Sequence, residues 1–178
     1  SGLSDLVIGI PVLGRDTNET QTIFGFFANV LPVRISVDPA LPFSVFLANV
    51  RDAVLDALDH AEAPLEQVLR ETKQVRDESR SPIYQTMFSF QDEAPVIATI
   101  GELHCESIPT PIKGIAEDLT FWMWNPDSGL KAHVAYATDL FTRETARRLA
   151  DRYVRVLTLA CETPHTRVGD LDVVSAAE

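Results

Sequence analysis

The sequence predicts an α+β domain built on a mixed β-sheet flanked by helices, and three observations lead to this class. Short β-branched or aromatic runs typical of strands occur at 6–12 and 119–124. Apolar residues at helical spacing fill 43–58 and return after Thr142. The two kinds of segment alternate irregularly, with a hairpin signal at 125–129, so both crossovers and hairpins are expected.

The composition narrows the class of protein. The chain has 178 residues, enough for one domain with its own core or for one lobe of a larger domain. It carries 15 Lys and Arg against 26 Asp and Glu, a net charge of −11, which argues against binding to a phosphate backbone. No apolar run is long enough to span a bilayer, and no signal peptide is recognisable, so a cytoplasmic protein without nucleic-acid or membrane partners is expected.

The first half of the chain is predicted to hold two strands and two helices. A buried strand is expected at 6–12, a polar loop at 14–22, and a second strand within the apolar stretch 23–37. A helix follows over 43–58 with Ser44 as its N-cap. A short helix over 65–71 begins after Pro64.

The second half is predicted to be richer in strands. Alternation indicates a strand at 83–91, and a weak one is expected at 102–108. The segments 119–124 and 130–138 form the hairpin, and Thr142 caps a long helix. A last strand is expected at 168–174.

Residues for autonomous catalysis or metal binding are missing from the sequence. The two cysteines are too few for a disulfide framework or a structural zinc site, and the four histidines form no metal-spaced cluster. No nucleophile elbow, P-loop or dinucleotide fingerprint is present. His104 and Cys105 are neighbours on an expected strand, so their side chains point to opposite faces. No catalytic and no metal-binding residues are therefore assigned.

Five segments in fixed order resemble the condensation domain of nonribosomal peptide synthetases, enzymes of secondary-metabolite and antibiotic biosynthesis. Three of them are similar to the family motifs GxFVNTxxxR, HQDxPFE and RDxSRNPLFQxMFxxQ, and two flanking stretches agree with its strand ending in GR and its YxTDLF segment. In this sequence they are FGFFANVLPVR (24–34), HAEAPLE (60–66), RDESRSPIYQTMFSFQD (76–92), DLVIGIPVLGR (5–15) and YATDLFTRETARRLADRY (136–153).

The resemblance implies a two-lobed fold, each lobe like chloramphenicol acetyltransferase, of which 1–178 would be the C-terminal lobe. The family's catalytic HHxxxDG motif belongs to the N-terminal lobe, and no copy of it occurs here. Residues 170–178 resemble the start of a linker towards an adenylation domain. The chain is therefore expected to be inactive alone, although it is part of a peptide-bond-forming acyltransferase.

The resemblance also implies the reaction and the partners. In the family, the amine of an acceptor aminoacyl group attacks the thioester of a donor acyl or peptidyl group and forms an amide bond. Both groups ride on phosphopantetheine arms of carrier domains, which enter a tunnel between the lobes from opposite ends. The expected partners are thus the N-terminal lobe, the donor and acceptor carrier domains and the adenylation domain, and this lobe binds no cofactor directly.

Candidate tunnel-lining residues follow from the same resemblance. Asn29 matches the family Asn, with a satisfied buried amide as the alternative, and Val30 replaces the Thr that follows it in the family. Thr120 lies near a small hydroxyl position of the family. Trp122 and Trp124 share one face of their strand, which lines either the tunnel or the lobe interface.

Two arginines are candidates for structural roles between the lobes. Arg15 matches the family Arg that pairs with the Asp of HHxxxDG, with a solvated loop residue as the alternative. Without that carboxylate a buried guanidinium is costly, so Arg15 is expected to be exposed in this chain. Arg80 matches the family's R-N-P and is expected to be structural.

Two further functions stay open. One is a non-catalytic docking or scaffold domain of the same fold that binds carrier domains, and the other is an acyltransferase acting on a diffusible acyl thioester. Ester formation and cyclisation share these motifs with amide formation. The sequence does not specify the substrates, their stereochemistry or the oligomeric state.

Overall fold

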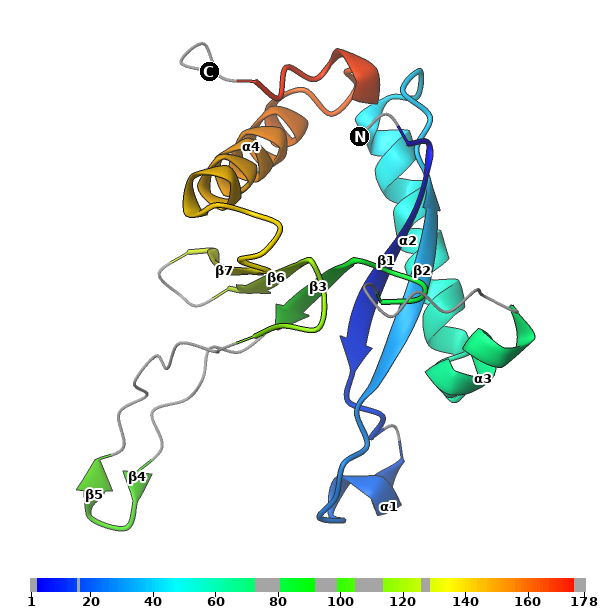
Figure 1. The fold of residues 1–178 in the computed structure, drawn as a ribbon, viewed down its shortest axis with the longest axis vertical. Coiled ribbons are helices and arrows are strands. Elements are labelled where there is room, and N and C mark those ends of the chain that lie inside the picture. Colours follow the sequence, from blue (N-terminus) through cyan, green and yellow to red (C-terminus); the bar gives the residue numbers. More distant parts are fainter. Residues whose placement is uncertain are drawn as a thin grey trace.

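A computed structural model describes residues 3–15, 17–72, 81–91, 99–104, 114–125 and 129–174. Its centre is a five-stranded sheet in the order β2-β1-β3-β6-β7 (Figure 1). The strands are β1 (Asp5–Val12), β2 (Asn29–Ser36), β3 (Thr86–Gln91), β6 (Leu119–Trp124) and β7 (Lys131–Tyr136). The pairs β1–β2 and β6–β7 are antiparallel, whereas β1–β3 and β3–β6 are parallel. The predicted α+β class with a mixed sheet is confirmed.

The described helices differ in length and place. The longest are α2 (Phe43–Asp59) and α4 (Arg143–Glu162), and the short ones are α1 (Asn18–Gln21), α3 (Leu65–Glu71) and the 3₁₀ turn η1 (Val168–Asp170). Side chains from both α2 and α4 line one apolar cavity together with residues of β1, β2, β3 and β6, so both helices cover the same face of the sheet. The opposite face is covered by neither α2 nor α4.

The core lies between the sheet and its two long helices. Leu31, Val33 and Met123 are buried on strands, and Ala146 and Ala160 are buried on α4. Strand alternation explains the pattern, because residues two apart along β2 point to the same side. The Phe121 and Tyr153 rings meet with centroids 5.1 Å apart, and the Tyr153 hydroxyl donates to Met123 Sδ at 3.4 Å. Burial raises the pKa of the Tyr153 phenol.

The strand expected within 23–37 is present as β2, but three other expectations about local structure need correction. The expected loop at 14–22 contains the short helix α1. Pro42, not Ser44, is the N-cap of α2, because the amides of Phe43 and Ser44 donate to the carbonyls of Thr166 and Pro164.

The expected strand at 168–174 was wrong: the structure has η1 there. Its amides donate to Leu41 and Pro39 carbonyls, and a segment with prolines at 39 and 42 lacks the N–H groups that a ladder would need.

A second, two-stranded sheet lies apart from the main one (Figure 1). It pairs β4 (Thr99–Ile100) with β5 (Leu103–His104) as an antiparallel hairpin. The predicted weak strand at 102–108 overlaps β5, and its last four residues lie outside the described part.

Candidate functional site

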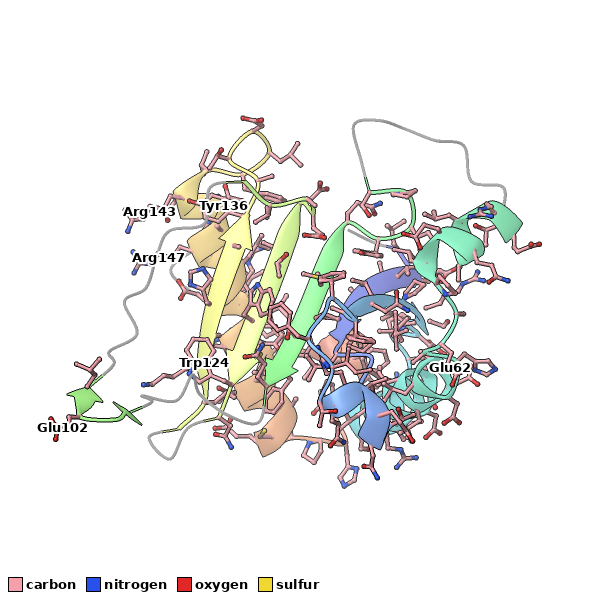
Figure 2. The ribbon with its side chains drawn as sticks, turned by 90° about the horizontal axis from the view of Figure 1, so that it is seen from below. Glu62, Glu102, Trp124, Tyr136, Arg143 and Arg147 are labelled. Atoms are coloured by element: carbon pink, nitrogen blue, oxygen red, sulfur yellow. The ribbon has the colours of Figure 1, made fainter. Side chains whose placement is uncertain are left out.

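The sheet face away from α2 and α4 carries three of the predicted site residues. Thr120, Trp122 and Trp124 alternate along β6 with Phe121 and Met123, which line the cavity on the α4 side. Because alternate strand residues point to opposite faces, the two tryptophans point away from α4. Both are half-buried, and Trp124 lies at the end of β6 in Figure 2. The structure thus brings Thr120, Trp122 and Trp124 together on one surface, which we call the open face.

Thr120 is the most buried residue of the open face. Its exposed fraction is 1%, and its Oγ1 is the one buried side-chain atom without a hydrogen-bond partner among the residues that the structure describes. Strand register places it beside Met87 and Ala135, neither of which offers a polar side chain. Thr120 is therefore buried even though neither long helix lies on its face of the sheet. A buried hydroxyl without a hydrogen-bond partner lowers the stability of the fold.

The register across the open face also decides what chemistry it supports. Trp122 pairs with Ser89 on one side and His133 on the other. Two strand spacings separate Ser89 from His133, about 9–10 Å, which is too far for a hydrogen bond. The row therefore contains no Ser–His pair that could act as an activated nucleophile, and an indole ring lies between its two polar residues.

Tyr84 covers the β1 side of the open face. Its ring carbons lie 2.7 Å from the position that a Cβ on Gly9 would take, so only glycine allows this packing. Tyr84 is 5% exposed, and burial together with the Glu117 carboxylate raises the pKa of its phenol. A flat aromatic ring thus lies directly on the β1 backbone.

Asn29 lies away from these residues. It shares the strand parity of buried Leu31 and so points to the helix-covered side. Its Nδ2 donates to the carbonyls of Ala61 and Ala63, both at 3.1 Å, and its Oδ1 accepts from the Val30 amide at 2.9 Å. The amide thereby ties the start of β2 to the connection between α2 and α3. These contacts favour the structural interpretation of Asn29.

Arg15 organises the connection between β1 and β2. Its guanidinium donates to the carbonyl oxygens of Thr20, Ile23 (2.7 Å) and Gly25 (2.9 Å). Its Cζ also lies 4.5 Å from the centroid of the Phe27 ring, a cation–π distance. Arg15 is half-buried, so the expectation of an exposed side chain was wrong. Main-chain carbonyls thus stabilise the Arg15 guanidinium.

The same connection carries apolar residues, some of them from the stretch 23–37 in which the second strand was predicted. Residues 13–15 and 17–28, which we call the tip, include Phe24, which is fully exposed, and Phe26, which is 91% exposed. Leu13 and Ile23 are exposed as well. The apolar run 23–28 suggested burial, and its glycine at 25 was the available signal that the run is not a regular strand.

A polar cavity of about 450 Å³ lies between the tip and the start of α3. Thr17 and Thr20 line it from the tip, and Glu62 and Glu66 line it from the other side. Figure 2 shows Glu62 beside the helices of this half of the molecule. The surroundings of the tip are therefore acidic.

Several expected features lie outside this region. Arg80 and Cys105 are not among the described residues. His60 forms the C-cap of α2, and its Nδ1 contacts the Asp56 carbonyl at 2.8 Å. Within the described ranges no cluster of three metal-ligating side chains occurs, and no helix is both long and apolar enough to cross a bilayer.

Comparisons with known proteins agree with this architecture. The family model described as "Condensation domain" matches residues 1–178. Surfactin synthase subunit 1 of Bacillus subtilis (strain 168) is 33% identical over the whole chain, which spans 5% of that protein. The X-domain in a complex with OxyB from teicoplanin biosynthesis is 33% identical with a TM-score of 0.85, covering 97% of this chain and 38% of that one.

A further neighbour supports the fold alone. The condensation domain from the monacolin K polyketide synthase MokA is 22% identical with a TM-score of 0.81, over 94% of this chain and 39% of that one. The sheet and its helices therefore have the chloramphenicol acetyltransferase-like fold of these domains. The chain spans about two fifths of each of these two domain chains.

Proposed function

The chain belongs to the condensation-domain family, and from this premise we propose that residues 1–178 form the C-terminal lobe of a nonribosomal peptide synthetase condensation domain. One observation carries the proposal: the family model matches all 178 residues, yet these residues span only 38–39% of two neighbouring domain chains. One lobe, rather than a whole domain, accounts both for the match of the family model to the full chain and for the coverage of only 38–39% of each domain chain. The sequence motifs in fixed order support the same assignment.

The open face is proposed to form one wall of the reaction tunnel. Trp122 and Trp124 are half-buried on a sheet face that α2 and α4 leave uncovered. Each indole offers an apolar ring face and one N–H donor, which suits an extended arm with apolar and amide portions such as phosphopantetheine. The arm belongs to the carrier domains and brings the thioester to the reacting amine.

The reaction at this wall would be aminolysis of a thioester. The acceptor nitrogen forms a bond to the donor carbonyl carbon, the carbon–sulfur bond breaks, and the amine proton must leave while the thiolate gains one. On the open face Ser89 and His133 are separated by Trp122, so they form no nucleophile–base pair, and the motif to which the family resemblance assigns proton transfer does not occur in this sequence. The proposal therefore assigns proton transfer to the HHxxxDG lobe and assigns orientation and exclusion of water to this one. The chain alone would be inactive.

Peptide formation by the full-length synthetase tests this role. With donor and acceptor carriers loaded, Trp122→Ala and Trp124→Ala are expected to lower the rate of product release measured by mass spectrometry. Leu55→Ala serves as the matched control, because Leu55 is an exposed apolar residue on α2. Full activity of both tryptophan variants would remove the open face from the tunnel.

A second candidate function is a docking domain that recruits a partner enzyme. The observation in its favour is the identity to solved structures: two X-domain chains are 33% and 31% identical, one of them in a complex with OxyB, against 20–22% for several condensation domains. If the full-length wild-type protein with loaded carriers releases no peptide but retains OxyB in a pull-down, the docking function replaces condensation.

A further inference from the structure

Trp122 is the largest side chain in its part of the open face. In its row across the sheet it lies between Ser89 and His133, and the next row holds Thr120 and Ala135. Ser89 and Thr120 are small and buried, with exposed fractions of 6% and 1%. The Trp122 indole is half-buried, so its base is supported by these neighbours while part of the ring still reaches solvent.

Trp124 continues this aromatic surface along β6. Residues two apart on a strand lie on the same face, about 6.8 Å from each other. Two van der Waals contacts of about 3.5 Å span that distance, so a flat ring between the two indoles can contact both. The ring contacts among the described residues join Phe43 to Phe46 and Phe121 to Tyr153, and neither indole takes part in one. In the described part of the chain, therefore, no other aromatic ring stacks on these indoles.

We propose that Trp122 is the specificity-determining residue of the open face and that it favours a thioester substrate carrying a neutral aromatic side chain. The inference rests on the proposed function, which it deepens by naming the substrate class. Contact between aromatic rings stabilises a complex beyond the burial of apolar area, by an amount that corresponds to about fivefold in affinity. An aliphatic group of the same size gains only the burial. The ring belongs to the donor acyl group or to the acceptor aminoacyl group, and loading the two carriers separately distinguishes these sources.

The charged residues near the indoles favour a neutral ring over a cation. A cationic side chain also binds to the face of a tryptophan ring. Strand register, however, places Lys131 beside Trp124, so a cationic substrate would approach an ammonium group. The neighbours of Trp122 in its row, Ser89 and His133, are not acidic. The row therefore offers ring surface without the carboxylate that would hold a cationic substrate.

Peptide formation by the full-length synthetase tests the selection. The donor or the acceptor carrier is loaded in separate reactions with phenylalanyl or cyclohexylalanyl thioesters, which are nearly equal in size and differ in aromaticity. The wild type is expected to favour the phenylalanyl group about fivefold at one of the two carriers, measured as initial rates by mass spectrometry. Trp122→Leu should lower the phenylalanyl rate to the cyclohexylalanyl rate, and Trp122→Phe should keep most of the preference. Leu55→Ala is the matched control, because Leu55 is 53% exposed on α2.

Equal rates for the two thioesters at both carriers, or a preference that Trp122→Leu leaves unchanged, would overturn the proposal. Retained turnover of the cyclohexylalanyl thioester shows that Trp122→Leu is folded.

Binding provides a second measurement that does not depend on turnover. Calorimetry of the full-length protein with the N-acetylcysteamine thioesters of phenylalanine and cyclohexylalanine should give dissociation constants about fivefold apart in the wild type and equal in Trp122→Leu. Equal constants in the wild type would contradict the selection. A protein that forms no peptide but shows this Trp122-dependent preference would refute the proposed function and leave the selection intact, and peptide formation without any preference would do the reverse.

Discussion

The tip and the β6–α4 layer use aromatic residues in opposite ways. In the layer, Phe121 packs on Tyr153 and the Tyr153 hydroxyl contacts Met123, so the rings are stabilised by one another. In the tip, Phe24 and Phe26 contact little of the described chain, and Arg15 and main-chain carbonyls hold the backbone. Aromatic content alone therefore does not identify the core. The two regions differ in what fixes the backbone, which in the tip is Arg15 with main-chain carbonyls rather than the exposed rings.

Truncation of one apolar residue in each region should give the largest contrast. Met123→Ala removes a side chain that is 4% exposed, and the expected loss of unfolding free energy is about 2–5 kcal/mol. Phe24→Ala removes a fully exposed ring, and the expected change in this chain is within about 0.5 kcal/mol. Urea unfolding followed by tryptophan fluorescence measures both. A similar cost for the two variants would mean that the tip is packed in the free chain, and the comparison would fail.

Gly9→Ala should have the next largest effect and extends the comparison to the open face. A methyl group would lie 2.7 Å from the Tyr84 ring, so either the ring or the strand must shift, at a cost of about 1–3 kcal/mol. Thermal unfolding of the purified chain gives the change. Because the contact is with ring carbons, Tyr84→Phe should not relieve it, whereas Tyr84→Val should recover part of the loss. Additive effects of Gly9→Ala and Tyr84→Val would contradict a direct clash.

The sequence predicts the β6–α4 layer well and the tip poorly, for a physical reason. Strand periodicity places Phe121 and Met123 on one face. The prediction of burial succeeds there because the residues that pack on this face, on α4, belong to the same chain. The run 23–28 has the same apolar character and belongs to the stretch 23–37 in which a strand was predicted, but it lies outside β2. The Phe24 and Phe26 rings have no cover in the described chain, so the pattern that predicts burial fails here. Pattern alone does not identify which surface supplies the cover.

The sequence predicted those parts of the candidate site that depend on strand alternation, and it did not predict those that depend on main-chain hydrogen-bond partners. Strand alternation placed Trp122 and Trp124 on one face without any knowledge of tertiary contacts. The roles of Asn29 and Arg15 depend on carbonyl groups of Ala61, Ala63, Ile23 and Gly25, and main-chain acceptors leave no trace in side-chain patterns. The resemblance identified which of these residues matter. The structure supplies the partners that explain them within this chain.

Arg15→Gln sharpens the comparison by loosening the tip without touching its rings. Glutamine reaches fewer carbonyls and cannot stack as a cation on Phe27, so amides in 17–28 should exchange with solvent about tenfold faster. Hydrogen exchange with mass spectrometry resolves the region. Amides of β6 and α4 provide the internal control and should be unchanged. Arg15→Lys should be intermediate, because it keeps the charge and loses the planar fork. Unchanged exchange in 17–28 would show that Gly14 and the capping box alone fix the tip.

His60 should give the smallest effect, and it concerns the connection beside the tip. The Asp56 carbonyl that it contacts raises the pKa of the His60 imidazole above its ordinary value of 6.5, and the Asp56 and Asp59 carboxylates act in the same direction. Because the folded pKa is the higher one, protonated His60 stabilises the fold fully below the unfolded pKa, and this contribution is lost as the pH rises through the folded pKa. A positive charge on His60 is also stabilising because it lies at the C-terminal end of α2, where the helix dipole is negative. NMR titration of the imidazole should show the raised pKa, and His60→Gln should flatten a slight fall in stability between about pH 6 and 8. An imidazole that titrates below 6.5 would mean that protonation of His60 destabilises the fold. The contact between His60 and Asp56 would then not stabilise the end of α2, which precedes the Ala61 carbonyl that accepts from Asn29.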